Sequence, residues 1–162
     1  MRKNIFAAAG GWLLVIACGT GSAQTGADYG ADLGALYGER YWIQAYKDVC
    51  VSVLPKSRRD LQGAYDEWRA RHEEVVEDLE LRFAAMVKGM SRDEAEYQQN
   101  YNKYYDVVMR QRDEDKGNLR KLPREDLVKQ CKELPGYLRG PGSDMYNTHP
   151  KAFGAIYGKK RP

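Results

Sequence analysis

The feature that most limits how this chain folds is a long apolar run at helical spacing that ends directly before a second helix start signal. The apolar face of the run recurs every three or four residues: Leu61, Ala64, Tyr65, Trp68, His72, Val75, Val76, Leu79, Phe83, Met86 and Val87. Ser57 is placed as its N-cap and Gly89 as its C-cap. Ser91 and Glu94 then form an S-x-x-E capping box. Because so short a connection reverses the chain, we predict an antiparallel helical hairpin.

Two shorter helices flank this hairpin. The first is predicted from Glu39 until Pro55 ends it, with Tyr41, Trp42, Ala45, Tyr46, Val49, Cys50, Val53 and Leu54 at helical intervals. The last opens near Pro123 and runs to Pro135 through Leu127, Val128, Cys131 and Leu134. The second arm of the hairpin stops near Gly117. The predicted fold class is therefore all-α.

Two of the three cysteines predict a covalent link across this fold. Cys50 and Cys131 are equally distant in sequence from a turn centred between residues 90 and 91, so they should meet at the open end of the hairpin. An even pair without metal-type spacing is most simply a disulfide in an oxidising compartment. Closing a loop of that length would contribute about 4.5 kcal/mol on the chain-entropy estimate.

The N-terminus predicts export. Arg2 and Lys3 precede an uncharged, mostly apolar run over residues 5–17, shorter than a membrane-spanning helix needs. Small residues before Gln24 suit signal peptidase, so residues 1–23 are predicted to be a signal peptide and the protein to be periplasmic or secreted. A second interpretation stays open, in which residues 15–18 act as a lipobox and Cys18 becomes the lipid-anchored first residue.

Composition divides the remaining chain into three parts. Residues 24–38 carry glycine at every fourth position and are predicted to form a flexible leader, since repeated glycine is costly in an exposed helix. Residues 39–135 form the predicted helical domain. Residues 136–162, rich in glycine and proline and basic at the end, are predicted to be a disordered tail. A formal net charge of +3 at pH 7 does not call for nucleic acid as a partner.

No motif predicts catalysis, a metal site or a cofactor. His72 and Glu73 begin like the zinc motif H-E-x-x-H, but Val76 stands where the second histidine would be. His72 is also the one histidine outside the predicted tail, which leaves little for a Ser-His-Asp triad. We therefore expect a protein that is not an enzyme.

The best candidate for a binding surface is a group of tyrosines in the second arm of the hairpin: Tyr97, Tyr101, Tyr104 and Tyr105. Each ring can be buried while its hydroxyl reaches water or a partner, and tyrosine is typical of recognition surfaces. The sequence thus favours an exported binding module for a protein or envelope component, resembling chaperones or inhibitors in function.

An alternative function rests on His72 and Met109. In the predicted hairpin these residues face each other, and a histidine and a methionine are axial ligands that a haem can use. This alternative is a bundle that binds haem or another small ligand, although the chain has no C-x-x-C-H attachment motif.

Overall fold

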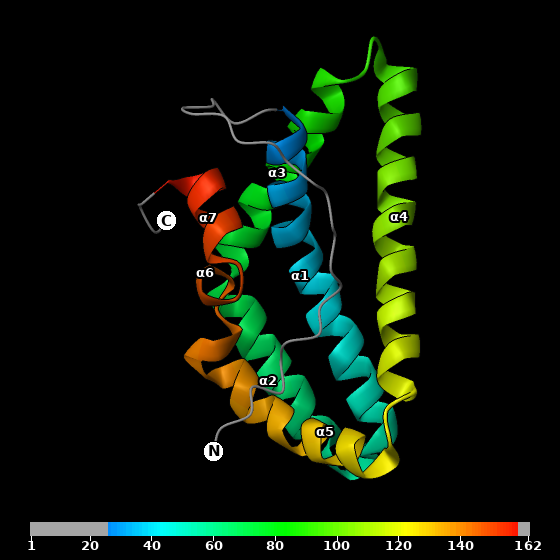
Figure 1. The fold of residues 1–162 in the computed structure, drawn as a ribbon, viewed down its shortest axis with the longest axis vertical. Helices are drawn as coiled ribbons and strands as arrows, with labels where there is room; N and C mark the ends of the chain where they lie inside the picture. Colours follow the sequence, from blue (N-terminus) through cyan, green and yellow to red (C-terminus); the bar gives the residue numbers. More distant parts are fainter. Residues whose placement is uncertain (1–25, 159–162) are drawn as a thin grey trace, which may run out of the picture.

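The computed structural model describes residues 26–158, and within that range all regular structure is helical (Figure 1). The helices are α1 (Gly26–Val53), α2 (Arg58–Arg71), α3 (Glu73–Gly89), α4 (Glu94–Arg120), α5 (Arg124–Arg139), α6 (Met145–Thr148) and α7 (Pro150–Tyr157), with single turns η1 (Pro55–Ser57) and η2 (Pro141–Ser143). The prediction of an all-α fold is confirmed. The predicted signal peptide lies outside the described residues.

Helix α1 is the central element of the bundle. It packs against α2, α3, α4, α5 and α7, and in Figure 1 it runs between the α2–α3 pair and α4. Its buried residues point to several sides of the helix: Leu33, Leu36, Tyr37, Tyr41, Ile43, Ala45, Tyr46, Val49 and Cys50. A helix that is apolar around its circumference belongs in a core, and here that core forms around α1.

The N-terminal part of α1 corrects the prediction of a flexible leader over residues 24–38. From Gly26 onward these residues are helical, and Leu33, Leu36 and Tyr37 are at most 2% exposed. Each glycine costs about 1 kcal/mol of helix propensity, whereas burying each large side chain contributes about 1.5–3 kcal/mol. Tertiary burial therefore outweighs the glycine cost, and α1 begins well before Glu39.

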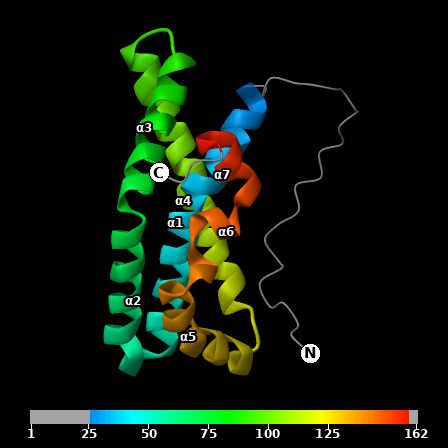
Figure 2. The same ribbon diagram turned by 90° about the vertical axis from the view of Figure 1, so that its left-hand side faces the viewer.

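The predicted long helix is divided at His72 into α2 and α3. The backbone N–H of His72 is shared between Trp68 O and Arg69 O, at 3.2 and 3.1 Å. The imidazole Nδ1 lies 2.8 Å from the same Trp68 oxygen. Because the imidazole is hydrogen-bonded to the Trp68 carbonyl oxygen, the regular helix is interrupted at His72 and resumes at Glu73 (Figure 2).

The turn before α4 is made by a different cap from the predicted one. Asp93 is the N-cap, and its side chain accepts a hydrogen bond from the Glu96 N–H at 2.9 Å. The Glu96 carboxylate in turn accepts from the Arg92 N–H at 2.6 Å. The two arms meet near this turn, but α1 enters between α2 and α4 further down (Figure 1). The arms therefore do not face each other along their whole length.

The C-terminal segment corrects the prediction of a disordered tail from residue 136. Helix α5 continues through Pro135 to Arg139, because Leu134 and Leu138 on either side of the proline are buried. Beyond it, Asp144 caps α6 by accepting a hydrogen bond from the Tyr146 N–H at 2.9 Å. Helix α7 buries Ala152, Phe153 and Ile156. The helical domain is thus larger than residues 39–135.

The predicted disulfide is confirmed. Cys50 on α1 and Cys131 on α5 are bonded, with their Cα atoms 5.0 Å apart, and both side chains are at most 1% exposed. The two helices pack directly on each other. Direct packing of α1 on α5, rather than a facing pair of hairpin arms, therefore brings these cysteines together.

Candidate functional site

Two of the four tyrosines predicted to bind a partner belong partly to the core. Tyr101 meets the edge of Phe83 with ring centroids 5.6 Å apart, and Tyr97 lies 5.8 Å from Tyr101. Phe83 itself stacks on Tyr37 at 4.6 Å. Burial and the neighbouring Tyr41 hydroxyl raise the pKa of Tyr37, so this phenol stays protonated. We call Tyr37, Phe83, Tyr101 and Tyr104 the aromatic cluster.

The other two tyrosines are open to solvent. Tyr104 is 39% exposed, Tyr105 is 38% exposed and the nearby Val107 is 46% exposed. Tyr104 also touches Phe83 edge-on at 6.1 Å, so the ring is held by the aromatic cluster while part of it faces water. Tyr104 and Val107 are three residues apart and lie side by side on the helix surface. Tyr105 lies on the opposite side of Tyr101 around the helix. We call Tyr104, Tyr105 and Val107 the exposed α4 surface.

The exposure of α4 follows from its place in the bundle. Among the described helices of ten residues or more it stands at the edge in Figure 1, and none of its 27 residues is fully buried. It contacts α1 and α3, and Lys116 ties it to Asp48 of α1 at 2.8 Å. One side of α4 is thus attached to the core and the other is available.

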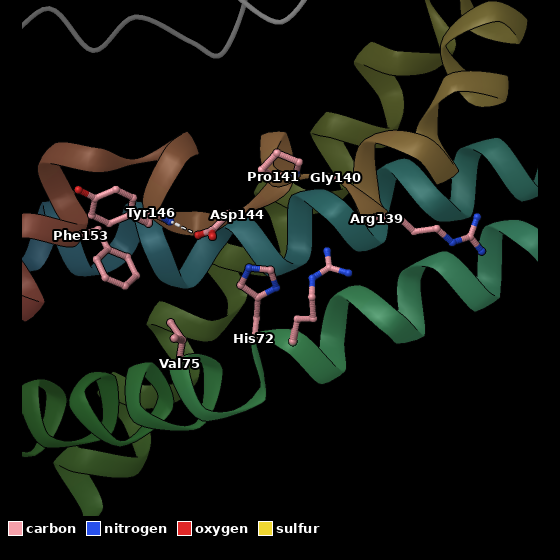
Figure 3. Close-up of a pocket in the computed structure, with 9 residues that line it drawn as sticks. His72, Val75, Arg139, Gly140, Pro141, Asp144, Tyr146 and Phe153 are labelled. Carbon is pink, nitrogen blue, oxygen red and sulfur yellow. Dashed lines mark hydrogen bonds between the residues drawn. The ribbon is translucent and has the colours of Figure 1, made fainter. Parts of the chain in front are cut away.

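A second candidate site is a hollow of about 250 Å³ beside the junction of α2 and α3 (Figure 3). It lies between that junction and the segment that links α5 to α7. Its lining residues are Arg71, His72, Val75, Arg139, Gly140, Pro141, Asp144, Tyr146 and Phe153. Polar groups stand on one side and apolar groups on the other, which suits a small amphipathic ligand.

His72 forms part of the wall of this hollow and is only 7% exposed. Its ring packs on the indole of Trp68 with centroids 4.7 Å apart. Since Nδ1 lies 2.8 Å from a carbonyl oxygen, Nδ1 carries the proton and donates it to Trp68 O. The second ring nitrogen, Nε2, has no hydrogen-bond partner among the described residues.

Arg71 supplies the free positive charge at the hollow. One of its guanidinium nitrogens donates to Leu138 O, and the remaining donors have no partner among the described residues. Arg139 also borders the hollow, but it is paired with Asp60 and Glu67, each at 2.9 Å. Arg71 can therefore donate hydrogen bonds to a ligand, whereas the Arg139 guanidinium is already paired with two carboxylates.

His72 and Met109 are not brought together. His72 lies at the junction of α2 and α3, whereas Met109 lies on α4, and α1 passes between these elements (Figure 1). The predicted facing pair depended on a hairpin whose arms touch along their length. A haem held by these two side chains therefore has no support in this arrangement.

The fold and these surfaces define the class of protein as a disulfide-bonded α-helical bundle with an exposed tyrosine-bearing edge helix. A scan against protein-family models, a search of curated proteins and a search of solved structures each found no match. In the part of the chain that the structure describes, no helix is both long enough and apolar enough to cross a membrane.

The hollow includes residues that sequence reasoning did not select. Asp144, Tyr146 and Phe153 lie in the segment predicted to be disordered, and Arg71 was one of many exposed arginines. A signal was present in the spacing of Ala152, Phe153 and Ile156, which repeats at three and four residues. In a helix of eight residues that pattern is too short to stand out.

Proposed function

We propose that this protein is an exported, non-enzymatic helical protein that binds another protein or an envelope component through the exposed α4 surface. The observation that carries the proposal is the exposure of Tyr104, Tyr105 and Val107 on a helix with no fully buried residue. When a partner covers exposed tyrosine and valine side chains, apolar surface is removed from water, and this stabilises the complex.

The way Tyr104 is held supports binding further. Its contact with Phe83 restricts the ring before any partner arrives, and ordering a side chain on association otherwise costs about 0.5–1.5 kcal/mol. Tyrosine has two side-chain torsions, so a tyrosine already packed at its edge is a rigid anchor. Export is supported by the N-terminal basic and apolar segments and agrees with the Cys50–Cys131 disulfide.

The proposal can be tested by placing a photoreactive amino acid at position 107 and cross-linking in the source organism. We expect an adduct of one discrete mass. The Tyr104→Ser/Tyr105→Ser variant should reduce its yield by about tenfold or more, because interface tyrosines often contribute over 1 kcal/mol each. Its melting temperature should fall by only a few degrees, since both rings are more than a third exposed and Tyr104 contacts Phe83 at its edge.

A matched control is Tyr146→Ser, because Tyr146 is also 39% exposed but lies on α6, on the other side of α1 from α4 (Figure 1). This variant should cross-link at position 107 as well as the unmodified protein. An adduct of twice the chain mass would identify the partner as a second copy. The proposal is wrong if a folded Tyr104→Ser/Tyr105→Ser protein gives the same adduct at full yield.

A further inference from the structure

We propose that the hollow beside the α2–α3 junction binds a small monocarboxylate with an apolar body, about the size of phenylacetate. The carboxylate would lie at Arg71 and His72, and the body against Val75 and Phe153. This site is independent of the exposed α4 surface, since α1 separates the two (Figure 1).

The first support is the unpaired nitrogen of His72. The ring is nine-tenths buried, and its Nδ1–H is used by Trp68 O. Nε2 therefore remains without a partner among the described residues, on the wall of a hollow. Nε2 is not among the described buried atoms that lack a partner, so it is open to the hollow and can bond to a ligand there. A ring protonated at both nitrogens would donate from Nε2 to a carboxylate oxygen, which is the same ionised form of the ligand that pairs with Arg71.

The second support is the position of the Arg71 guanidinium. Its bond to Leu138 O holds it at the edge of the hollow, while four of its five N–H donors remain. A carboxylate accepts two parallel N–H bonds from a guanidinium, a charge-assisted pairing about twice as strong as neutral hydrogen bonds. Arg139 cannot compete for the ligand, because Asp60 and Glu67 already hold it.

The remaining walls determine the rest of the ligand. Val75 and Phe153 form an apolar side, and Tyr146 meets the Phe153 ring edge-on at 5.6 Å. Asp144 adds one negative charge at the rim (Figure 3). A second carboxylate on the ligand would meet that charge, so the site should prefer monocarboxylates. The volume of about 250 Å³ limits the body to about one ring.

The proposal is tested by NMR titration of the disulfide-bonded protein with phenylacetate. The indole N–H of Trp68 is a built-in reporter, because it donates to Ser143 O at 2.8 Å, next to Asp144, and its ring contacts His72. We expect saturable shifts of this signal with a Kd of about 1 mM or below. Phenylacetamide has the same shape without the charge, and its Kd should be at least about tenfold higher than that of phenylacetate.

Protein variants give the second comparison. Arg71→Gln should weaken phenylacetate binding by about tenfold, and Arg69→Gln, which changes an exposed arginine in the same turn of α2 outside the hollow, should leave it unchanged. Absence of a saturable Trp68 shift, or equal binding of phenylacetate and phenylacetamide, overturns the proposal even if Arg71→Gln does not fold. Tighter binding of a tripeptide with a C-terminal phenylalanine than of phenylacetate would identify the source of the carboxylate as a peptide end.

Discussion

Trp68 links two parts of the chain that are 75 residues apart, because its indole N–H donates to Ser143 O at 2.8 Å. The side chain is fully buried, and its ring packs on the His72 ring, which lines the hollow. One residue thus connects α2 to the segment predicted to be a disordered tail. Its loss should affect both the stability of the bundle and the geometry of the hollow.

Replacement of Trp68 by alanine should lower the free energy of unfolding by about 3–5 kcal/mol, which is the cost of removing a large buried ring. Trp68→Phe should cost less, because it fills most of the space but leaves Ser143 O without its donor. Urea denaturation followed by far-UV circular dichroism measures both values. A change below about 0.5 kcal/mol for the alanine variant would contradict the buried position.

At the scale of single elements, Asp48 connects α1 to α4. Its carboxylate lies 2.8 Å from Lys116 on α4 and 2.7 Å from Lys47 beside it. Burial alone would raise the pKa of Asp48, but the hydrogen bonds from Lys116 and Lys47 outweigh burial and hold the pKa below its ordinary value of 3.8. A carboxyl with a lowered pKa stabilises the folded state when it is ionised.

The effect of acid on this pair follows from the sign of that shift. The stabilisation is fully present above pH 3.8 and is lost as the pH falls below that value, through the pKa of the folded state. Asp48→Asn should therefore cost about 0.5–1 kcal/mol at neutral pH, since the group is partly exposed to solvent. Urea denaturation at several pH values should show the difference from the unmodified protein shrinking in acid. A difference independent of pH would mean that the charge of Asp48 does not matter.

The helices themselves show what local signals can and cannot predict. The turn before α4 and the end of α1 near Pro55 were readable, because caps and prolines act on their own neighbours. The start of α1 was not, because its glycines oppose a helix locally and only burial of Leu33, Leu36 and Tyr37 reverses that preference. The break at His72 depends on one side chain bonding to one carbonyl, and no periodicity reports such a bond.

For the whole molecule, the disulfide is the main covalent restraint. The disulfide joins residues separated by 81 positions. Closing so long a loop removes much conformational entropy from the unfolded chain. A Cys50→Ala/Cys131→Ala variant should have a free energy of unfolding lower by about 4.5 kcal/mol on the chain-entropy estimate. Chemical denaturation with and without a reductant measures this, and the reductant should not affect the variant. Equal stability of the reduced and oxidised protein would contradict the estimate.

The candidate sites were predictable to different degrees at this scale. The tyrosines were found because a cluster of one residue type is visible in the sequence, yet which of them face outward depends on where Phe83 lies. The hollow could not be predicted, because Arg71 and Asp144 lie far apart in the chain and meet only through the packing of α5 to α7. Cys50 and Cys131 were paired correctly, although the packing that joins them differs from the hairpin that suggested the pair.

The central position of α1 also has a consequence for how the protein is made. Helix α1 leaves the ribosome well before α7, which packs against it. Until then the apolar surface of α1 lacks part of its cover, so a nascent chain that stops before Pro150 should depend on chaperones to stay out of aggregates. The bundle can be completed only after α7 has left the ribosome, so the addition of one short helix determines when the long central helix becomes fully covered.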